Sequence, residues 1–240
     1  ADGRPCWLVL GPPGAGKTSL AVSYLQKRRL ASLWYQLDEG DADLATLFHY
    51  LREAAPQGAE RLPALGPEYL PALHTFAQRF FRELLALLEP PFAVVLDNYQ
   101  DVQVAAFHEV TREAIAQVPP GGRLIILSRT GPPPALARLL ANRAIHLLPP
   151  EDLRLTPLEL ERLVRRGGRR DLTREALRAL HEQADGWAAR VVLLLSRPER
   201  AAPAPGGGRP RRPPSSITLR ARSSRAWTPP PGRSCSRSRS

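Results

Sequence analysis

The stretch Gly11-Pro12-Pro13-Gly14-Ala15-Gly16-Lys17-Thr18 matches the phosphate-loop pattern Gly-x-x-x-x-Gly-Lys-[Ser/Thr] at every fixed position. The apolar run Trp7-Leu8-Val9-Leu10 precedes it, and a helical pattern covers residues 17–29. Glycines let the main chain approach a polyphosphate, while successive N–H groups and a helix N-terminus supply positive potential. The alternative is a Gly/Pro-rich surface turn, which the flanking strand and helix disfavour.

The loop predicts ATP or ADP with Mg²⁺ as cofactors. Lys17 is expected to reach the β- and γ-phosphates, and the Thr18 hydroxyl to ligate Mg²⁺. The residues expected to surround the phosphates are Gly11, Pro12, Pro13, Gly14, Ala15, Gly16, Lys17, Thr18 and Ser19.

A second nucleotide-binding element is predicted where the apolar run Ala93-Val94-Val95-Leu96 ends in Asp97. At the carboxyl end of its strand, Asp97 would hold Mg²⁺ beside Thr18. The alternative is a strand followed by a capping Asp. Asn98 comes next, and its amide can hydrogen-bond a water but cannot accept a proton from it at neutral pH. The sequence therefore predicts slow hydrolysis, with Lys17, Asp97 and Asn98 in the catalytic set.

A third apolar run, residues 124–127, ends in Ser128-Arg129. Either residue is a candidate sensor of the γ-phosphate, and Arg129 completes the catalytic set. A strand-terminal arginine that faces solvent is an equally good interpretation. The five histidines lack metal-binding spacing and are expected to be ordinary surface or half-buried residues; they are His49, His74, His108, His146 and His181.

The arrangement of apolar segments predicts an α/β fold with a doubly wound parallel sheet over residues 1–149. Continuous apolar runs at 8–10, 93–96 and 124–127 are typical of strands covered on both faces. Weaker strand candidates lie at 33–37 and 144–148, and helical patterns cover 43–55, 68–88 and 102–118. Strands that alternate with helices favour this fold class.

After residue 149 the pattern becomes purely helical, which predicts a small helical appendage over residues 150–200. Thr156-Pro157-Leu158-Glu159 forms a capping box with proline at the first helical position. Asp171 or Thr173 opens a second helix that Asp185-Gly186 closes, and a third runs from near Trp187 to Ser196.

The charge is unevenly distributed along the chain. The net charge is +11, and residues 201–240 contribute nine arginines and no acid, which leaves +2 for residues 1–200. We therefore expect no basic groove and no DNA binding from residues 1–200. The tail is rich in Pro, Gly, Ser and Arg and is predicted to be disordered. It is either a basic nucleic-acid-binding arm or, the interpretation we favour, a frameshift product, because a neighbouring reading frame can encode an amphipathic helix.

The remaining composition predicts a cytoplasmic protein that contacts no membrane. No apolar run approaches the ~18–20 residues of a membrane helix. Cys6 and Cys235 form neither a disulfide framework nor a metal site, so the reducing cytosol is expected. Methionine is absent even from position 1, which predicts that the true N-terminus is missing.

Several strings occur in an order that resembles one family. They are the phosphate loop, Trp34-Tyr35-Gln36-Leu37-Asp38-Glu39 with Asp43, Val94-Val95-Leu96-Asp97-Asn98-Tyr99, Leu127-Ser128-Arg129 and Ala184-Asp185-Gly186-Trp187-Ala188. Over about residues 5–200 the chain resembles the ATP-binding module of large LuxR-type transcriptional regulators. These form the maltose-regulator-like group of the STAND class of P-loop NTPases.

The resemblance implies a regulatory switch. In such proteins ADP holds a closed monomer, ATP with an inducer permits self-association, and a C-terminal helix-turn-helix binds promoter DNA. By motif match, residues 11–19 hold the phosphates, Thr18 and Asp97 hold Mg²⁺, and Arg129 monitors the γ-phosphate. Asn98 stands where the family usually has a second Asp, and no helix-turn-helix follows, so the expectation is a truncated module.

Two other functions stay open at this point. The first is a P-loop kinase for a small molecule, whose lid arginines would come from Arg165, Arg166, Arg169 and Arg170. The second is a degenerate fragment that binds nucleotide weakly.

Overall fold

A single parallel sheet of five strands forms the centre of the computed structural model, which describes residues 3–56, 58–169 and 171–196. The strand order is β2-β3-β4-β1-β5. Cys6, which begins β1, lies opposite Leu124 and Ile145, which begin the two neighbouring strands, so the amino ends share one edge. The strands are β1 (Cys6–Leu10), β2 (Ala31–Gln36), β3 (Phe92–Asp97), β4 (Leu124–Ser128) and β5 (Ile145–Leu148).

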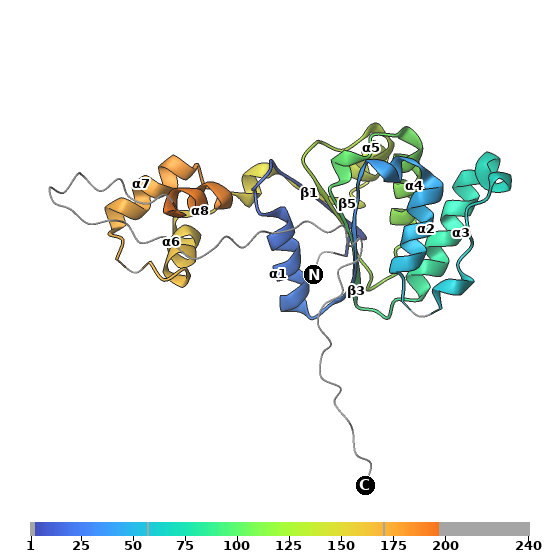
Figure 1. Ribbon diagram of the computed structural model, residues 1–240, viewed down its shortest axis with the longest axis horizontal. Coiled ribbons are helices and arrows are strands. Elements are labelled where there is room, and N and C mark those ends of the chain that lie inside the picture. Colours follow the sequence, from blue (N-terminus) through green and yellow to red (C-terminus); the bar gives the residue numbers. More distant parts are fainter. Residues whose placement is uncertain (1–2, 57, 170, 197–240) are drawn as a thin grey trace, which may run out of the picture.

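Helices cover both faces of this sheet (Figure 1), which confirms the predicted doubly wound α/β fold. On one face lies α1 (Lys17–Arg28). The opposite face carries α2 (Leu44–Ala54), α3 (Leu73–Ala86), α4 (Ala105–Ala116) and α5 (Ala137–Ala141). The two weaker strand candidates are also present as β2 and β5.

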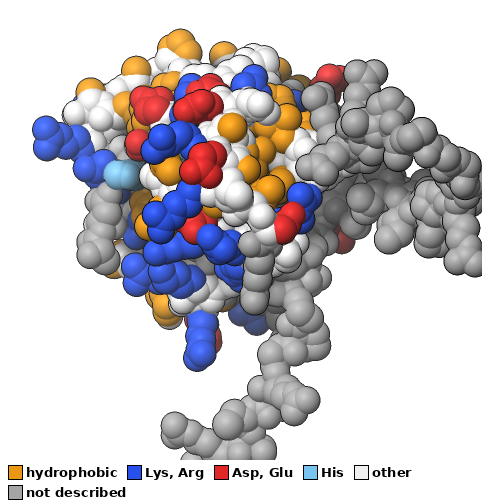
Figure 2. Space-filling model, turned by 90° about the vertical axis from the view of Figure 1, so that its left-hand side faces the viewer, with side chains coloured by type: hydrophobic (Ala, Val, Ile, Leu, Met, Phe, Trp, Pro, Cys, Tyr) orange, Lys and Arg blue, Asp and Glu red, His pale blue; other side chains and the backbone are white. Residues whose placement is uncertain are grey.

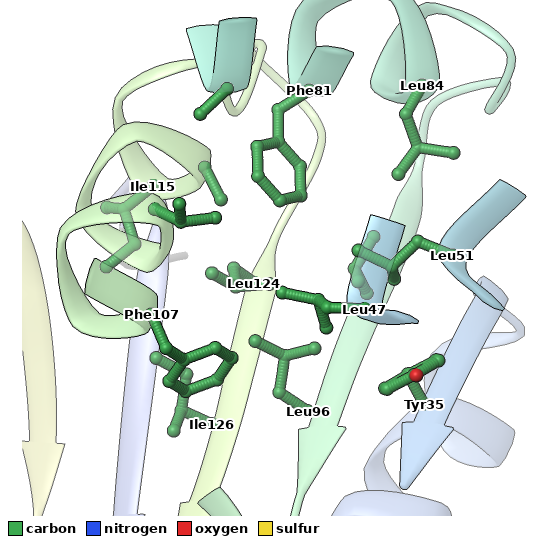
Figure 3. Close-up of a cluster of buried hydrophobic side chains, with 14 of the residues drawn as sticks. Tyr35, Leu47, Leu51, Phe81, Leu84, Leu96, Phe107, Ile115, Leu124 and Ile126 are labelled. Atoms are coloured by element: carbon green, nitrogen blue, oxygen red, sulfur yellow. The ribbon is translucent and has the colours of Figure 1, made fainter. Parts of the chain in front are cut away.

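The larger hydrophobic core lies between the sheet and α2, α3 and α4 (Figure 3). Every residue of β3 is buried, because this strand has a neighbour on each side and helices on both faces. A smaller cluster under α1 joins Ala21 and Leu25 to strand residues that include Trp34. The prediction that continuous apolar runs mark two-sided burial is therefore confirmed.

Prolines explain two differences between the predicted and observed helices. The segment predicted as one helix over 68–88 begins with a 3-10 turn, Pro67–Ala72, and α3 starts only at Leu73. Pro71 lacks the N–H that an α-helix would need there. The short α5 was not predicted, since Pro132-Pro133-Pro134 before it interrupts any helical period.

Beyond the sheet, three helices share a small core of their own: α6 (Pro157–Arg166), α7 (Arg174–Ala184) and α8 (Ala188–Ser196). The predicted capping box is confirmed, because the Thr156 hydroxyl accepts the Glu159 N–H while the Glu159 carboxylate accepts the Thr156 N–H. Of the two candidates for the next cap, Thr173 caps α7, whereas Asp171 pairs with Arg169.

The tail predicted to be disordered, residues 201–240 with Cys235, lies outside the described residues. Within the described ranges, every helix is too short or too polar to cross a bilayer. The same ranges contain no group of three or more His, Cys, Asp or Glu side chains that could hold a metal ion.

Candidate functional site

The predicted phosphate loop connects the carboxyl end of β1 to the first turn of α1. Gly11 ties it to the sheet, because its N–H donates to the Ser128 carbonyl at 3.1 Å. Gly14 and Gly16 have φ angles of 77° and 90°, a backbone region that favours glycine. Gly16 caps α1 without a side-chain hydrogen bond, and no side chain of another described residue accepts from the first N–H groups of the helix. Such a helix start suits an anion.

Lys17 lies inside the curve of this loop. Its ammonium donates to the carbonyls of Gly11 at 2.7 Å and Pro12 at 3.1 Å. The pKa of Lys17 is lowered, first because burial removes the ammonium from water and then because the positive charge of Arg129 is near; Asp97 acts in the opposite direction. A buried cation whose hydrogen-bond partners among the described residues are neutral carbonyls is well placed to bind an anion.

Thr18 and Asp97 meet, although 79 positions separate them in the chain. The Thr18 hydroxyl donates to Asp97 Oδ2 at 3.1 Å, and the Asn98 N–H donates to Asp97 Oδ1 at 2.9 Å. Asp97 ends β3, two strands away from β1. The pair predicted to bind Mg²⁺ therefore lies together, at the carboxyl edge where α/β sheets bind ligands.

The other predicted site residues surround this pair. Asn98 is half-buried and has a φ of 59°, so it turns the chain sharply after β3. The Ser128 hydroxyl bonds within its own turn, donating to the Thr130 carbonyl and accepting the Thr130 N–H. Arg129 is exposed, and its charge reaches Lys17. Of the two sensor candidates, Arg129 is the one whose side chain forms no hydrogen bond or ion pair with another described residue.

Sequence reasoning missed three residues that position this site. Gln100 accepts the Arg129 N–H at 2.9 Å and so links the ends of β3 and β4. Leu153 packs against Gly11, where an added Cβ would lie 2.9 Å from its Cδ1. Ala189, in the first turn of α8, donates its N–H to the Gly14 carbonyl at 3.3 Å. An amide and two apolar residues leave no sequence signal, because their roles depend on tertiary contact.

The string from Trp34 to Asp43 has a structural role. Trp34 packs under α1. The Asp38 carboxylate accepts the Gly40 N–H, and Asp43 caps α2 by accepting from Ala45 and Thr46. The Tyr35 hydroxyl donates to the buried carboxylate of Asp41 at 2.6 Å. Trp187 is half-buried, and the Arg154 guanidinium lies 5.2 Å from its ring centre.

Two of the four arginines considered for a kinase lid form ion pairs within the helical appendage. Arg165 pairs with Glu161 on its own helix at 2.7 Å, and Arg169 pairs with Asp171. Arg166 is exposed, and Arg170 lies outside the described residues. The appendage meets the loop through α8, so no contact of the described arginines favours a kinase.

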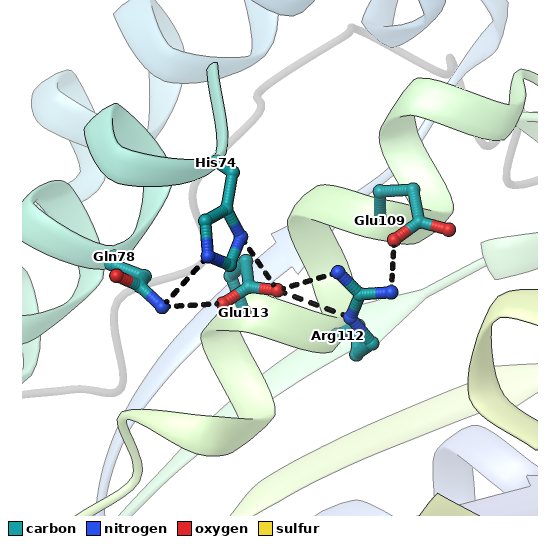
Figure 4. Close-up of polar contacts among 5 residues, drawn as sticks. All are labelled: His74, Gln78, Glu109, Arg112 and Glu113. Atoms are coloured by element: carbon teal, nitrogen blue, oxygen red, sulfur yellow. Dashed lines mark hydrogen bonds and ion pairs between the residues drawn. The ribbon is translucent and has the colours of Figure 1, made fainter. Parts of the chain in front are cut away.

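A second buried charge lies away from the strand ends, between α3 and α4 (Figure 4). Glu113 accepts from Gln78 at 3.0 Å, from Arg112 at 2.9 Å and from His74 Nδ1 at 3.0 Å. Glu109 holds the other side of Arg112. These partners occupy both oxygens of the buried carboxylate.

Comparison with known proteins finds sequence relatives among HTH-type transcriptional regulators. The chain is 29% identical over 197 residues to the HTH-type transcriptional regulator MalT of Serratia proteamaculans. It is 26% identical over 193 residues to the protein of the same name from Cronobacter sakazakii. Each alignment covers 78% of this chain and 21% of the relative, so the chain spans about a fifth of the length of these regulators. No family model matches.

Among solved structures, the chain is similar to the Thermotoga maritima RuvB Holliday junction branch migration motor, with a TM-score of 0.44 and 18% identity. It is also similar to a chain of the Drosophila ORC bound to DNA, with a TM-score of 0.46 and 15% identity. Each comparison covers 80% of this chain and 53% of the other. The described part of the chain is thus a parallel α/β fold with a phosphate loop, similar in sequence to one portion of HTH-type transcriptional regulators.

Proposed function

We propose that this chain is an ATP- and ADP-binding regulatory module that hydrolyses ATP slowly. The observation that carries the proposal is the convergence of Lys17, Thr18 and Asp97 at the carboxyl edge of the sheet, next to an uncapped helix start. Main-chain N–H groups and one ammonium bind phosphate in such a loop.

Magnesium fits the residues present. The Thr18 hydroxyl oxygen lies 3.1 Å from a carboxylate oxygen of Asp97, and hard oxygen donors are what Mg²⁺ prefers. Thr18 would hold the ion directly and Asp97 directly or through water. When bound, Mg²⁺ supplies charge neutralisation at the terminal phosphates. Lys17, released from the loop carbonyls, would balance the remaining negative charge.

Slow hydrolysis follows from Asn98. Its amide can orient a water by hydrogen bonding but cannot take the proton that water must lose. Arg129 is proposed to monitor the γ-phosphate, because its exposed side chain is free to turn toward the loop and its charge is felt at Lys17. A protein that holds ATP for a long time before hydrolysis suits a switch.

We further propose that residues 1–149 form the nucleotide-binding domain and residues 150–200 a helical lid. The similarity to HTH-type transcriptional regulators supports a regulatory role. We propose a regulator of the LuxR type that self-associates in the ATP state and works in the cytoplasm. Binding of the inducer and the promoter is left to other parts of the regulator.

Calorimetric titration of the folded chain with ATP and with ADP, in the presence of Mg²⁺, tests the proposal. We expect saturable heat with both nucleotides, and phosphate release slower than one turnover per minute, our order-of-magnitude estimate for a site without a general base. Absence of heat and of any thermal shift with either nucleotide would overturn it. Transfer of phosphate to a small acceptor would favour a kinase.

A further inference from the structure

The edge of the sheet opposite the phosphate loop collects cationic side chains from distant parts of the sequence. Arg4, Arg123 and Arg143 stand just before β1, β4 and β5, which are neighbours in the sheet. The register aligns them, because Cys6 lies opposite both Leu124 and Ile145. Three arginines therefore lie side by side at the amino ends of adjacent strands.

The end of α1 extends this row. Tyr24 on α1 packs against Trp7 of β1, with ring centres 4.7 Å apart. Lys27 and Arg28 follow Tyr24 by three and four residues, so they lie on the same face of the helix. Arg29 ends the helix beside them. We call these six residues the basic edge: Arg4, Lys27, Arg28, Arg29, Arg123 and Arg143.

Aromatic rings fix part of the basic edge in place. The Arg123 guanidinium lies 4.3 Å from the centre of the Trp7 ring. His146 lies 6.0 Å from the same ring and its Nδ1 is 2.9 Å from Arg4 Nη1. Cations stacked on rings are held with little freedom, which lowers the entropy lost when they bind an anion.

Acidic side chains are scarce in the described loops around this edge. Among the described residues of the loops that precede the five strands, Glu89 is the only acidic side chain. Lys27, Arg28, Arg29 and Arg143 are exposed, and none of them forms an ion pair with a described residue. Figure 2, which views the molecule from the side that carries the helical appendage in Figure 1, shows that Lys and Arg side chains also gather on the lower part of that face.

We propose that the basic edge binds the phosphate backbone of nucleic acid. An arginine guanidinium can form two parallel hydrogen bonds to one phosphate. A row of such cations at the strand ends is better suited to the repeating phosphates of a nucleic acid than to a single small anion. A lipid surface would require exposed apolar side chains among the cations. Here the rings of Trp7 and Tyr24 are half-buried, and the Arg123 guanidinium covers Trp7. The expectation of no DNA binding from residues 1–200 rested on their near-neutral net charge. A net charge does not show where the charged side chains lie, so this uneven distribution was hidden.

The test is fluorescence anisotropy of the full chain with a labelled 20-base-pair DNA duplex over a series of NaCl concentrations. The variant Lys27→Gln/Arg28→Gln/Arg143→Gln removes three charges from the basic edge. The matched control Arg82→Gln/Arg174→Gln/Arg178→Gln removes three exposed arginines from α3 and α7. Both variants keep residues 201–240, so any binding by the nine arginines there is common to the two.

We expect the basic-edge variant to bind DNA about tenfold more weakly, and its slope of log K against log salt to fall by about 2–3, at ~0.9 per phosphate contact. The control should match the wild type. Equal affinities of the two variants would overturn the proposal. The same variants are also tested for binding to phosphatidylserine vesicles. If the basic-edge variant loses affinity for the vesicles but keeps its affinity for DNA, the proposal is overturned and the edge binds a lipid surface instead. If the triple variant unfolds, Lys27→Gln and Arg143→Gln tested singly should each lower the slope by about one, and unchanged slopes would overturn the proposal equally.

Discussion

Two clusters of buried charge in this fold use their hydrogen-bonding capacity in opposite ways. Between α3 and α4, the Glu113 carboxylate is surrounded by three charged or polar side chains that neutralise and occupy it. At the phosphate loop, the Lys17 ammonium donates to two carbonyls of its own loop and to no other group of the described residues. We call the first the closed cluster, because its charged groups are paired with one another, and the second the open cluster, because its cation can still bind a ligand.

The difference separates structural from functional burial of charge. A fully paired buried ion adds little net stability, but removing its partners destabilises the folded state because a buried charge is then left uncompensated. A buried ion whose partners are neutral keeps most of its charge available to a ligand. Its burial also shifts its pKa, as the lowered pKa of Lys17 shows. Substitutions in the two clusters should therefore affect different measurements.

The largest expected effect comes from Lys17→Ala. We expect ATP affinity to fall at least about 100-fold, near 2.7 kcal/mol, because the ammonium that balances the terminal phosphates is lost. The free energy of unfolding should change by less than about 1 kcal/mol, since the lost bonds and the relieved burial of charge oppose each other. Calorimetry with ATP and urea unfolding measure the two quantities.

Lys27→Ala is the matched control, because Lys27 is the only other lysine and lies at the far end of the same helix. Its ATP affinity should equal that of the wild type. Equal ATP affinity of Lys17→Ala and Lys27→Ala would show that the loop cluster is not the nucleotide site.

Glu113→Ala should have the opposite profile. The side chain is 6% exposed, and its removal leaves Gln78, His74 and Arg112 without their common partner. We expect the free energy of unfolding to fall by about 2–3 kcal/mol, with ADP affinity unchanged. Glu109→Ala removes a 49% exposed carboxylate that contacts the same arginine, and should change stability by less than about 0.5 kcal/mol. A loss of ADP affinity in folded Glu113→Ala would contradict the separation of the clusters.

Local patterns in the sequence were sufficient to predict the sheet and the open cluster. Continuous apolar runs marked the buried strands, and the spacing of glycines and Lys17 marked the loop. The side chains of Thr18 and Asp97 were expected to meet, because strand ends share an edge in a parallel sheet, and they lie 3.1 Å apart. Each inference rested on residues close in the chain or on a general rule of topology.

The closed cluster and the basic edge could not be predicted in this way. Glu113 and its partners come from two helices whose contact depends on core packing, and their spacing matches no motif. The basic edge joins loops that are more than 100 residues apart, and its charge disappears in a sum over residues 1–200. The role of Ala189 at Gly14 was equally hidden, because an alanine N–H carries no sequence signal.

The contact between Ala189 and Gly14 also distinguishes the two clusters, because it places the cluster around Lys17 next to the helical appendage. Gly14→Ala would place a Cβ 2.5 Å from the Ala189 Cβ, whereas Gly16→Ala meets no atom within 4 Å. Both glycines have positive φ, so both substitutions carry about 1 kcal/mol of backbone strain. We expect Gly14→Ala to lower the free energy of unfolding by about 1 kcal/mol more than Gly16→Ala does.

A double-mutant cycle in urea unfolding isolates the contact. Adding Ala189→Gly to Gly14→Ala should recover about 0.5–1 kcal/mol beyond its effect in the wild type, because it removes the atom that clashes. The same addition to Gly16→Ala should recover nothing. Coupling of equal size in both pairs would mean that α8 does not rest on the loop.

The smallest expected effect concerns chemistry inside the open cluster. Asn98→Asp places a second carboxylate beside Asp97, and that group can accept a proton from water. We expect phosphate release at saturating ATP to rise about three- to tenfold, less than ~1.4 kcal/mol of barrier. Asn142→Asp makes the same charge change at the end of α5 and should leave the rate unchanged. If Asn98→Asp is no faster than Asn142→Asp, the missing proton acceptor is not what slows this site, and the rate must be limited by nucleotide release or by movement of the helical appendage.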